Sequence, residues 1–174
     1  MLACMSRSAT LQRAKILVPV ILLVLVAALV ASVVTAAPRK PPALLGASAG
    51  VTGGLARING VVPEETDGGM PAGATAALAV PPAEGLHRVR VLVELTALEK
   101  GGLAYDPSEY FVSGLGTGTW KALWSSPAPA DVPQGQSLNA TLVFDLPDRA
   151  IDLTLELPGG PGLSLGAAHH QARG

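Results

Sequence analysis

Three histidines and one methionine are the side chains of this sequence best suited to metal chemistry. His87 precedes a run of alternating apolar residues, His169 and His170 lie near the end of the chain, and Met70 stands between a glycine and a proline. Imidazole and thioether groups suit copper or zinc. No two of these residues have a metal-ligand spacing, and adjacent histidines of an extended chain point in opposite directions. They therefore define an alternative function, an envelope copper-handling module, which requires that they converge in the fold.

A catalytic constellation is not evident. The three histidines are the only side chains that ordinarily titrate near neutral pH. We expect His87, beside Arg88 at a strand entrance, to be solvated, and a Gly/Ala-rich end holding His169 and His170 cannot preorganise a base. We therefore predict that the protein is not an enzyme, and we assign no catalytic, cofactor-binding or metal-binding residues.

The charge balance argues against a nucleic-acid partner. The formal net charge is −1, whereas nucleic-acid binding needs a basic field. The glycine-rich stretch 114–118 resembles a phosphate loop only superficially, because neither a helix nor a Lys-Ser/Thr pair follows it. We expect an inter-strand loop there.

An uncharged apolar run occupies residues 16–34 and follows Arg13 and Lys15. A helix of such length crosses about 30 Å of hydrocarbon core, and the preceding basic residues favour a cytoplasmic amino terminus. The sequence therefore predicts a short cytoplasmic N-terminus at residues 1–15 and a transmembrane anchor at residues 16–35.

A cleaved signal peptide is the alternative to the anchor. Cleavage would follow Ala37, although Pro38 would then obstruct the peptidase. Cys4 is the only cysteine and precedes the apolar run, so it forms neither a lipoprotein cleavage box nor a disulfide in the exported part. Both alternatives export the C-terminal part. We expect a single-pass protein of the cell membrane with an extracytoplasmic domain.

Three segments follow the predicted anchor. Residues 36–54 are rich in Pro, Gly and Ala, which is typical of a linker. Residues 55–166 have the length of one domain. Residues 167–174 form a Gly/Ala-rich end that we expect to be a flexible tail.

Alternation of apolar and polar residues predicts strands in the domain. The clearest runs are residues 89–97, 138–146 and 151–157, of which the last two are expected to form a hairpin-like pair. A helical turn capped by Asp106 is expected before residue 110. Weaker strand candidates are residues 55–62, 75–80, 110–113 and 119–124.

About seven short strands without an amphipathic helix indicate an all-β fold. We predict an antiparallel immunoglobulin-like β-sandwich preceded by one transmembrane helix. Trp120 and Trp124 are four residues apart, which would place them on the same face of a strand.

Two phrases of the sequence carry a family resemblance. Residues 103–111 read Leu-Ala-Tyr-Asp-Pro-Ser-Glu-Tyr-Phe, and residues 134–136 lead into Leu-Val-Phe-Asp-Leu-Pro at 142–147. Over residues 55–157 the chain resembles the exported immunoglobulin-like (telokin-like) family known as domain of unknown function 4352. The resemblance implies an interaction or stabilising role in the cell envelope, without chemistry, and it brings no catalytic residues.

Together these features predict a membrane-anchored extracytoplasmic domain that mediates protein contacts. The composition, which leans to Ala, Gly, Val, Leu and Pro, is typical of a GC-rich bacterial coding bias. We therefore expect partners in the bacterial cell envelope.

Overall fold

The computed structural model describes residues 21–26, 41–64, 71–74, 76–114, 118–149 and 152–166. The chain divides into two compact units, Met1–Arg39 and Lys40–Gly174. In the first unit, residues 21–26 are helical and their apolar side chains are more than half exposed. No described helix is long and apolar enough to cross a membrane. Most of the predicted anchor, residues 16–35, lies outside the described residues.

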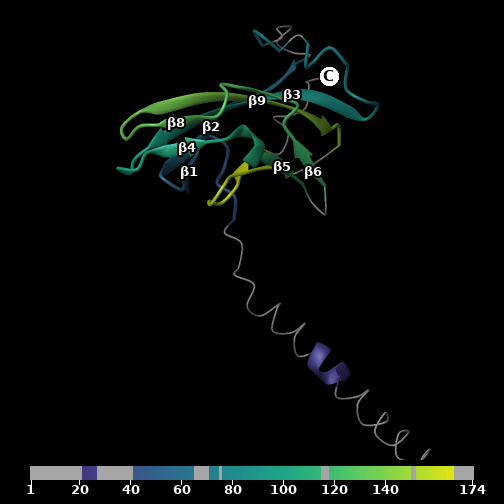
Figure 1. The fold of residues 1–174 in the computed structure, drawn as a ribbon. Coiled ribbons are helices and arrows are strands. Elements are labelled where there is room, and N and C mark those ends of the chain that lie inside the picture. The colour runs from purple at the N-terminus through teal and green to yellow at the C-terminus, as the bar shows by residue number, and fades with distance from the viewer. Residues whose placement is uncertain are drawn as a thin grey trace, which may run out of the picture. The chain divides into compact units, whose positions relative to one another are not determined.

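The second unit is built from antiparallel sheets (Figure 1). The strand orders are β1-β2-β3-β9-β7, β11-β10-β5-β6 and β4-β8. The strands of the five-stranded sheet are β1 (Ser48–Val51), β2 (Gly54–Pro63), β3 (Leu86–Ala97), β9 (Ser137–Pro147) and β7 (Trp124–Ser126). The other two sheets contain β11 (Leu163–Ser164), β10 (Thr154–Glu156), β5 (Phe111–Ser113), β6 (Thr119–Lys121), β4 (Leu103–Tyr105) and β8 (Ala130–Val132).

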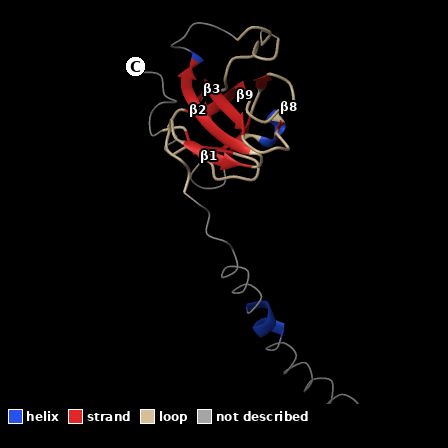
Figure 2. Cartoon of the chain, turned by 90° about the vertical axis from the view of Figure 1, so that its left-hand side faces the viewer, coloured by secondary structure: helices blue, strands red, loops and turns tan. Residues whose placement is uncertain are grey.

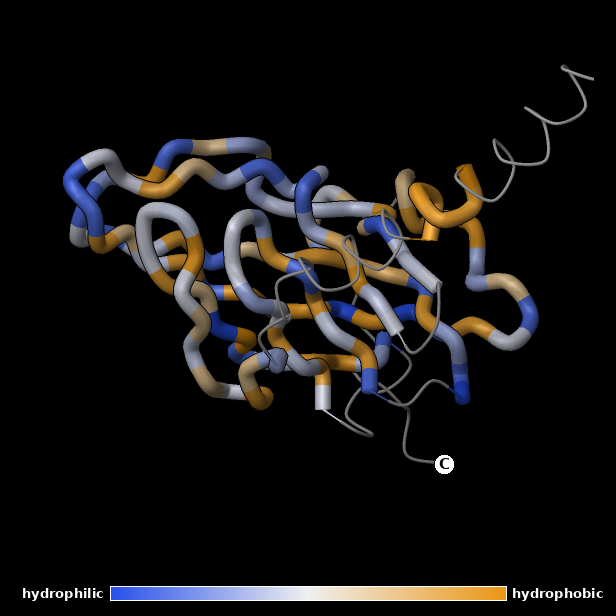
Figure 3. Tube along the Cα trace, turned by 90° about the horizontal axis from the view of Figure 1, so that it is seen from below, coloured by the Kyte–Doolittle hydropathy of each residue, from blue (hydrophilic) through white to orange (hydrophobic). Residues whose placement is uncertain are grey.

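The long strands β3 and β9 lie above β4, β5 and β6 of the smaller sheets in Figure 1, and Figure 2 shows β2, β3 and β9 side by side in one twisted layer. Their inner side chains, such as Val91, Leu95 and Phe144, are fully buried in one core. Val112 and Leu155 of the four-stranded sheet belong to the same core. Hydrophilic and hydrophobic residues are interleaved along the described trace in Figure 3, as expected for sheets that bury one face.

The predicted antiparallel, β-rich fold is confirmed. The structure describes eleven strands, more than the roughly seven expected. Two of the three clearest predicted runs correspond to β3 and β9, and the third, residues 151–157, contains only the short β10. Asp106 caps the 3-10 turn Pro107–Glu109, because its carboxylate accepts the Ser108 backbone N–H at 2.9 Å. The N-cap position was therefore predicted correctly.

The predicted hairpin between residues 138–146 and 151–157 is wrong. β9 pairs with β3 and β7, whereas β10 pairs with β5 and β11 in another sheet. Alternation reports which side chains share a face, but it does not report the partner strand. The two runs therefore contribute to the same core from different sheets.

Two weaker strand predictions also fail. The described residues of 75–80 form turns, and the predicted strand 119–124 is interrupted after Lys121, so that β6 and β7 belong to different sheets. Trp120 packs against the main core, whereas Trp124 packs against a second cluster of apolar residues. The expectation that both tryptophans share one strand face is therefore wrong.

The segment expected to be a linker, residues 36–54, contains β1. This strand pairs with β2 from Ser48 opposite Arg57 to Val51 opposite Gly54. The tight connection needs Gly53, whose φ is +87°, a conformation that L side chains rarely adopt. The sheet therefore begins before residue 55, and the predicted tail 167–174 lies outside the described residues.

Candidate functional site

The outer face of the five-stranded sheet is the surface on which polar side chains are most regularly arranged. Directly paired residues of neighbouring strands point to the same face, so the strand registers define successive rows across β2, β3 and β9. We call three of these rows the open half: Leu55, Thr96 and Ser137; Arg57, Glu94 and Asn139; Gly60, Leu92 and Thr141. We call the next two the covered half: Val62, Arg90 and Val143; Arg88 and Asp145.

Arg88 is the best-connected charged side chain of the covered half. Its Nε donates to Asp145 Oδ1 at 2.8 Å and its Nη2 to Asp145 Oδ2 at 3.2 Å, a bidentate pair. The guanidinium also donates to the carbonyls of Leu78 at 2.8 Å and Val80 at 2.7 Å. The hydrogen bonds from Arg88 to Asp145 raise the pKa of Arg88, with burial acting in the opposite direction. Arg88 thus fastens a loop to the sheet.

That loop, residues 71–80 as far as they are described, covers this half. Ala74 and Leu78 form a small apolar cluster with Val143, and Trp124 packs against it. Glu64, at the end of β2, lies 3.8 Å from Arg88 Nε. Leu78 is 2% exposed and the side chain of Arg88 is 6% exposed. This half is therefore already occupied by the protein's own chain.

The open half carries an exposed charge pair. Arg57 Nη2 lies 2.6 Å from Glu94 Oε2, and Asn59 Nδ2 donates to the same oxygen at 3.0 Å. The hydrogen bonds from Asn59 and then Arg57 lower the pKa of Glu94. Asn59 sits at a register shift of β2 between Ile58 and Gly60, a bulge that leaves it outside the ladder. The carboxylate is thus fixed as an anion on the surface.

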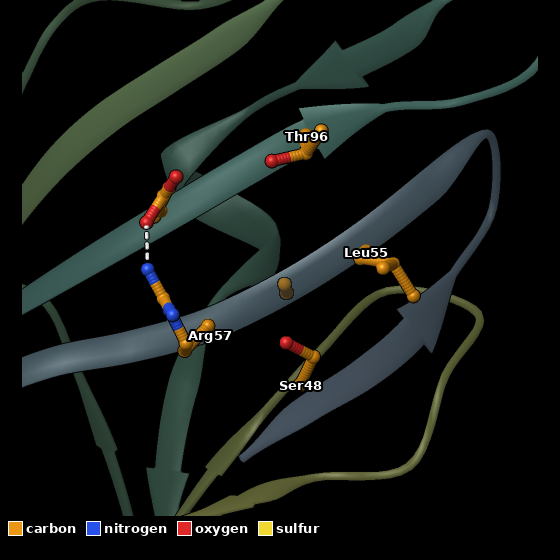
Figure 4. A pocket seen from close by; sticks show the side chains of 6 residues that line it. Ser48, Leu55, Arg57 and Thr96 are labelled. Carbon is orange, nitrogen blue, oxygen red and sulfur yellow. Dashed lines mark hydrogen bonds and ion pairs between the residues drawn. The ribbon is translucent and has the colours of Figure 1, made fainter. Parts of the chain in front are cut away.

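A shallow hollow of about 200 Å³ lies beside this pair (Figure 4). Ser48, Leu55, Arg57 and Thr96 are among its lining residues. It is open to solvent, and its walls combine a leucine with hydroxyl and charged groups. Nearby, the hydroxyls of Thr96 and Ser137 are hydrogen-bonded at 2.9 Å. These ordered donors and acceptors suit contact with another protein surface.

His87 lies at the start of a strand, as predicted, but it is not solvated. It is 7% exposed, and its Nδ1 lies 3.0 Å from Asp148 Oδ1. The expectation of a solvated histidine is wrong because β3 begins at Leu86, with His87 opposite Leu146 inside the ladder. The other members of the copper alternative, Met70, His169 and His170, lie outside the described residues.

The described part of the chain contains no group of three or more His, Cys, Asp or Glu residues that could hold a metal ion. The predictions of no enzyme, no cofactor and no assigned site residues stay predictions.

Comparisons with known proteins leave the family of the chain open. No protein-family model, no curated protein and no solved structure matches it. The resemblance to the telokin-like family stays a prediction.

Sequence reasoning missed the Arg88–Asp145 pair. Alternation predicted that Arg88 lies on the outer face of the sheet, which is correct. It also predicted that this face is exposed to solvent at Arg88, which is wrong because a loop covers it. One signal was available: Val143 interrupts the polar side of its run with a β-branched apolar residue, which indicates local cover. A loop containing Leu78 supplies that cover.

Proposed function

We propose that the protein is a membrane-anchored, extracytoplasmic immunoglobulin-like domain that acts by protein contact in the bacterial cell envelope, without catalysis. The observation that carries this proposal is the open half of the outer sheet face, where an ordered polar array lies exposed next to a half that the chain itself covers. A partner protein is the occupant that this surface suits, because a shallow surface that is open to solvent buries little of a small molecule.

The composition of the open half supports a contact role. Leu55 and Leu92 are 37% and 36% exposed, so each presents apolar area beside the charged row. Glu94 and Arg57 supply one fixed charge of each sign. Protein interfaces combine such apolar contacts with a polar rim and about one hydrogen bond per 100–200 Å².

The anchor is supported by the composition and exposure of the N-terminal segment. Residues 16–34 carry no charge, and the described helical part exposes apolar side chains, from 52% for Ile21 to 72% for Leu23. Such exposure is costly in water and favourable in lipid. Protease added to intact spheroplasts should cut an epitope placed after Gly174; protection until lysis would contradict the export of the domain.

Photo-crosslinking tests the contact role directly. A photoreactive phenylalanine analogue placed at Asn139, in the open half, should give a discrete crosslinked product in the envelope of the native cell. The same analogue at Lys121, an exposed residue of β6 in the other sheet, is the matched control. Equal products from both positions, or none from Asn139, would contradict the proposal.

A further inference from the structure

A second candidate site of the Lys40–Gly174 unit shares no lining residue with the open half. It is a cleft of about 400 Å³, within the range of about 300–1,000 Å³ that is usual for small-ligand sites. Its walls come from four segments: the β1–β2 turn with Thr52, the β3–β4 turn with Gly102, the 3-10 turn with Glu109, and the β10–β11 connection with Gly159. Segments distant in sequence thus converge on one cavity.

Close backbone packing fixes the walls of this cleft. A Cβ atom at Gly159 would overlap Thr52 Oγ1, and one at Gly102 would overlap the carbonyl oxygen of Val132. Both glycines have positive φ, +68° and +75°. The Gly53 carbonyl also accepts the backbone N–H of Leu98 at 2.9 Å. The cleft is therefore preformed, which reduces the entropy cost of binding.

The charged and polar groups that line the cleft favour a positively charged ligand. Glu109 contributes a carboxylate and Thr52 a hydroxyl, whereas none of the described residues that line the cleft is a Lys, Arg or His. Residues 99–109 include three acids, Glu99, Asp106 and Glu109, against one base, Lys100. An anion would meet repulsion here, and a cation would meet an accepting carboxylate.

The apolar residues that line the cleft favour a ligand with an aliphatic part. Val51, Ala104 and Pro158 contribute accessible apolar surface to the cleft, and Tyr110 lines it as a buried residue that is 2% exposed. Burial, followed by the neighbouring Tyr105 and Glu109, raises the pKa of Tyr110, so that its phenol stays neutral. An aliphatic stem packs on such surface, while its charged end reaches the more exposed rim.

We propose that this cleft binds a primary alkylammonium group on an aliphatic stem, with Glu109 as its counter-ion. Two sources share this chemistry: a lysine side chain of a peptide or protein, and a free diamine. The proposal is independent of the contact role of the open half, since none of its lining residues belongs to that surface.

Saturation-transfer NMR on the full chain in non-ionic detergent tests the proposal. The probes are N-acetyl-lysine methylamide and 1,5-diaminopentane, with N-acetyl-norleucine methylamide as the uncharged control. We expect transfer to both ammonium probes and about fivefold less to the norleucine control, because a charge-assisted hydrogen bond is lost. A stronger signal from the lysine probe assigns the peptide source, and a stronger signal from the diamine assigns the free amine. Equal transfer to norleucine and lysine, or transfer to none, would overturn the proposal.

Three variants locate the binding. Glu109→Gln removes the counter-ion and should reduce transfer to the lysine probe by about fivefold. Ala104→Phe fills the cleft from an exposed position and should abolish it. Glu99→Gln removes a carboxylate from the β3–β4 turn without touching the lining, and should leave transfer unchanged. Unchanged transfer in Glu109→Gln, or an equal loss in Glu99→Gln, would refute the assignment.

Discussion

The outer face of the five-stranded sheet carries an arginine opposite a carboxylate twice, once in each half. Arg57 pairs with Glu94 in the open half, and Arg88 pairs with Asp145 in the covered half, both across directly opposed positions. The side chains of the first pair are 47% and 26% exposed, and those of the second are 6% and 18% exposed. The same chemistry thus lies in two environments. The difference comes from one loop, which covers Arg88 and does not cover Arg57.

This contrast separates a structural pair from a pair available to a partner. Arg88 also donates to the buried carbonyl of Leu78 and the partly buried carbonyl of Val80, so its loss would leave these acceptors and Asp145 without their partner. The Arg57 pair has water as an alternative partner, and exposed ion pairs contribute little to folding. An exposed pair can therefore be retained for contact with another protein without being needed for the fold.

The largest expected effect compares the two arginines. Arg88→Met should lower the free energy of unfolding by about 3 kcal/mol, because it strands the partly buried Asp145 and two carbonyl groups. Arg57→Met should leave the denaturation midpoint nearly unchanged. Chemical denaturation of both variants beside the parent chain measures the difference. Similar midpoints for the two variants would break the distinction between the halves.

One leucine in each half allows the covered and open halves to be compared without a change of charge. Leu78 is 2% exposed in the covered half, and Leu92 is 36% exposed in the open half. Leu78→Ala should lower the free energy of unfolding by about 2–3 kcal/mol through loss of buried contacts and a residual cavity. Leu92→Ala should cost well under about 1 kcal/mol. Thermal melts of the two variants measure the difference. A larger loss of stability in Leu92→Ala than in Leu78→Ala would contradict the distinction between the two halves.

Tyr105 is a buried residue of the main core and carries a titratable group, in contrast to the partly exposed Glu94. Burial raises the pKa of Tyr105 to about 12, and its buried hydroxyl has no hydrogen-bond partner within the described structure. The folded state keeps the phenol proton while the unfolded state loses it above a pH of about 10. Stability should therefore be fully present below that pH and fall as the pH rises toward 12.

Tyr105→Phe should weaken this alkaline loss. At neutral pH the variant should be as stable as the parent or up to about 1 kcal/mol more stable, since it removes an unsatisfied buried group. Unfolding curves at several pH values measure both effects. A marked loss of stability at neutral pH would show that the hydroxyl has an essential partner.

The smallest expected effect concerns Glu94. Its pKa is lowered by the hydrogen bonds from Asn59 and Arg57, so the stabilisation is present above the usual pKa of glutamate and is lost as the pH falls through the folded value. An NMR titration of the Glu94 carboxyl should give a value below the usual range. Asn59→Ala should raise the pKa of Glu94 with no measurable change in melting temperature. An unchanged pKa would show that the hydrogen bond from Asn59 does not lower it.

The sequence predicted the inner face of the sheet well, since alternation along β3 and β9 identifies which side chains are buried. It could not predict the cover over Arg88, because burial on the outer face depends on a loop far from Asp145 in the chain. It also missed β1, since Ser-Ala-Gly-Val has the composition of a linker and becomes a strand only by pairing with β2. The burial of His87 was missed for a related reason: its strand begins at Leu86, three residues before the apolar run 89–97, so that His87 shares a face with Val89 and Val91.

Cysteine accessibility tests the central claim most directly. In a Cys4→Ser background, which removes the only native cysteine, Asn139→Cys reports on the open half and Lys121→Cys on the other sheet. We expect maleimide modification of Asn139→Cys to be at least about fivefold slower in native membranes than in the purified protein, because a bound partner excludes the reagent. Lys121→Cys should react at similar rates in both. Equal rates for Asn139→Cys in membranes and in purified protein would contradict the claim that the open half is a contact surface.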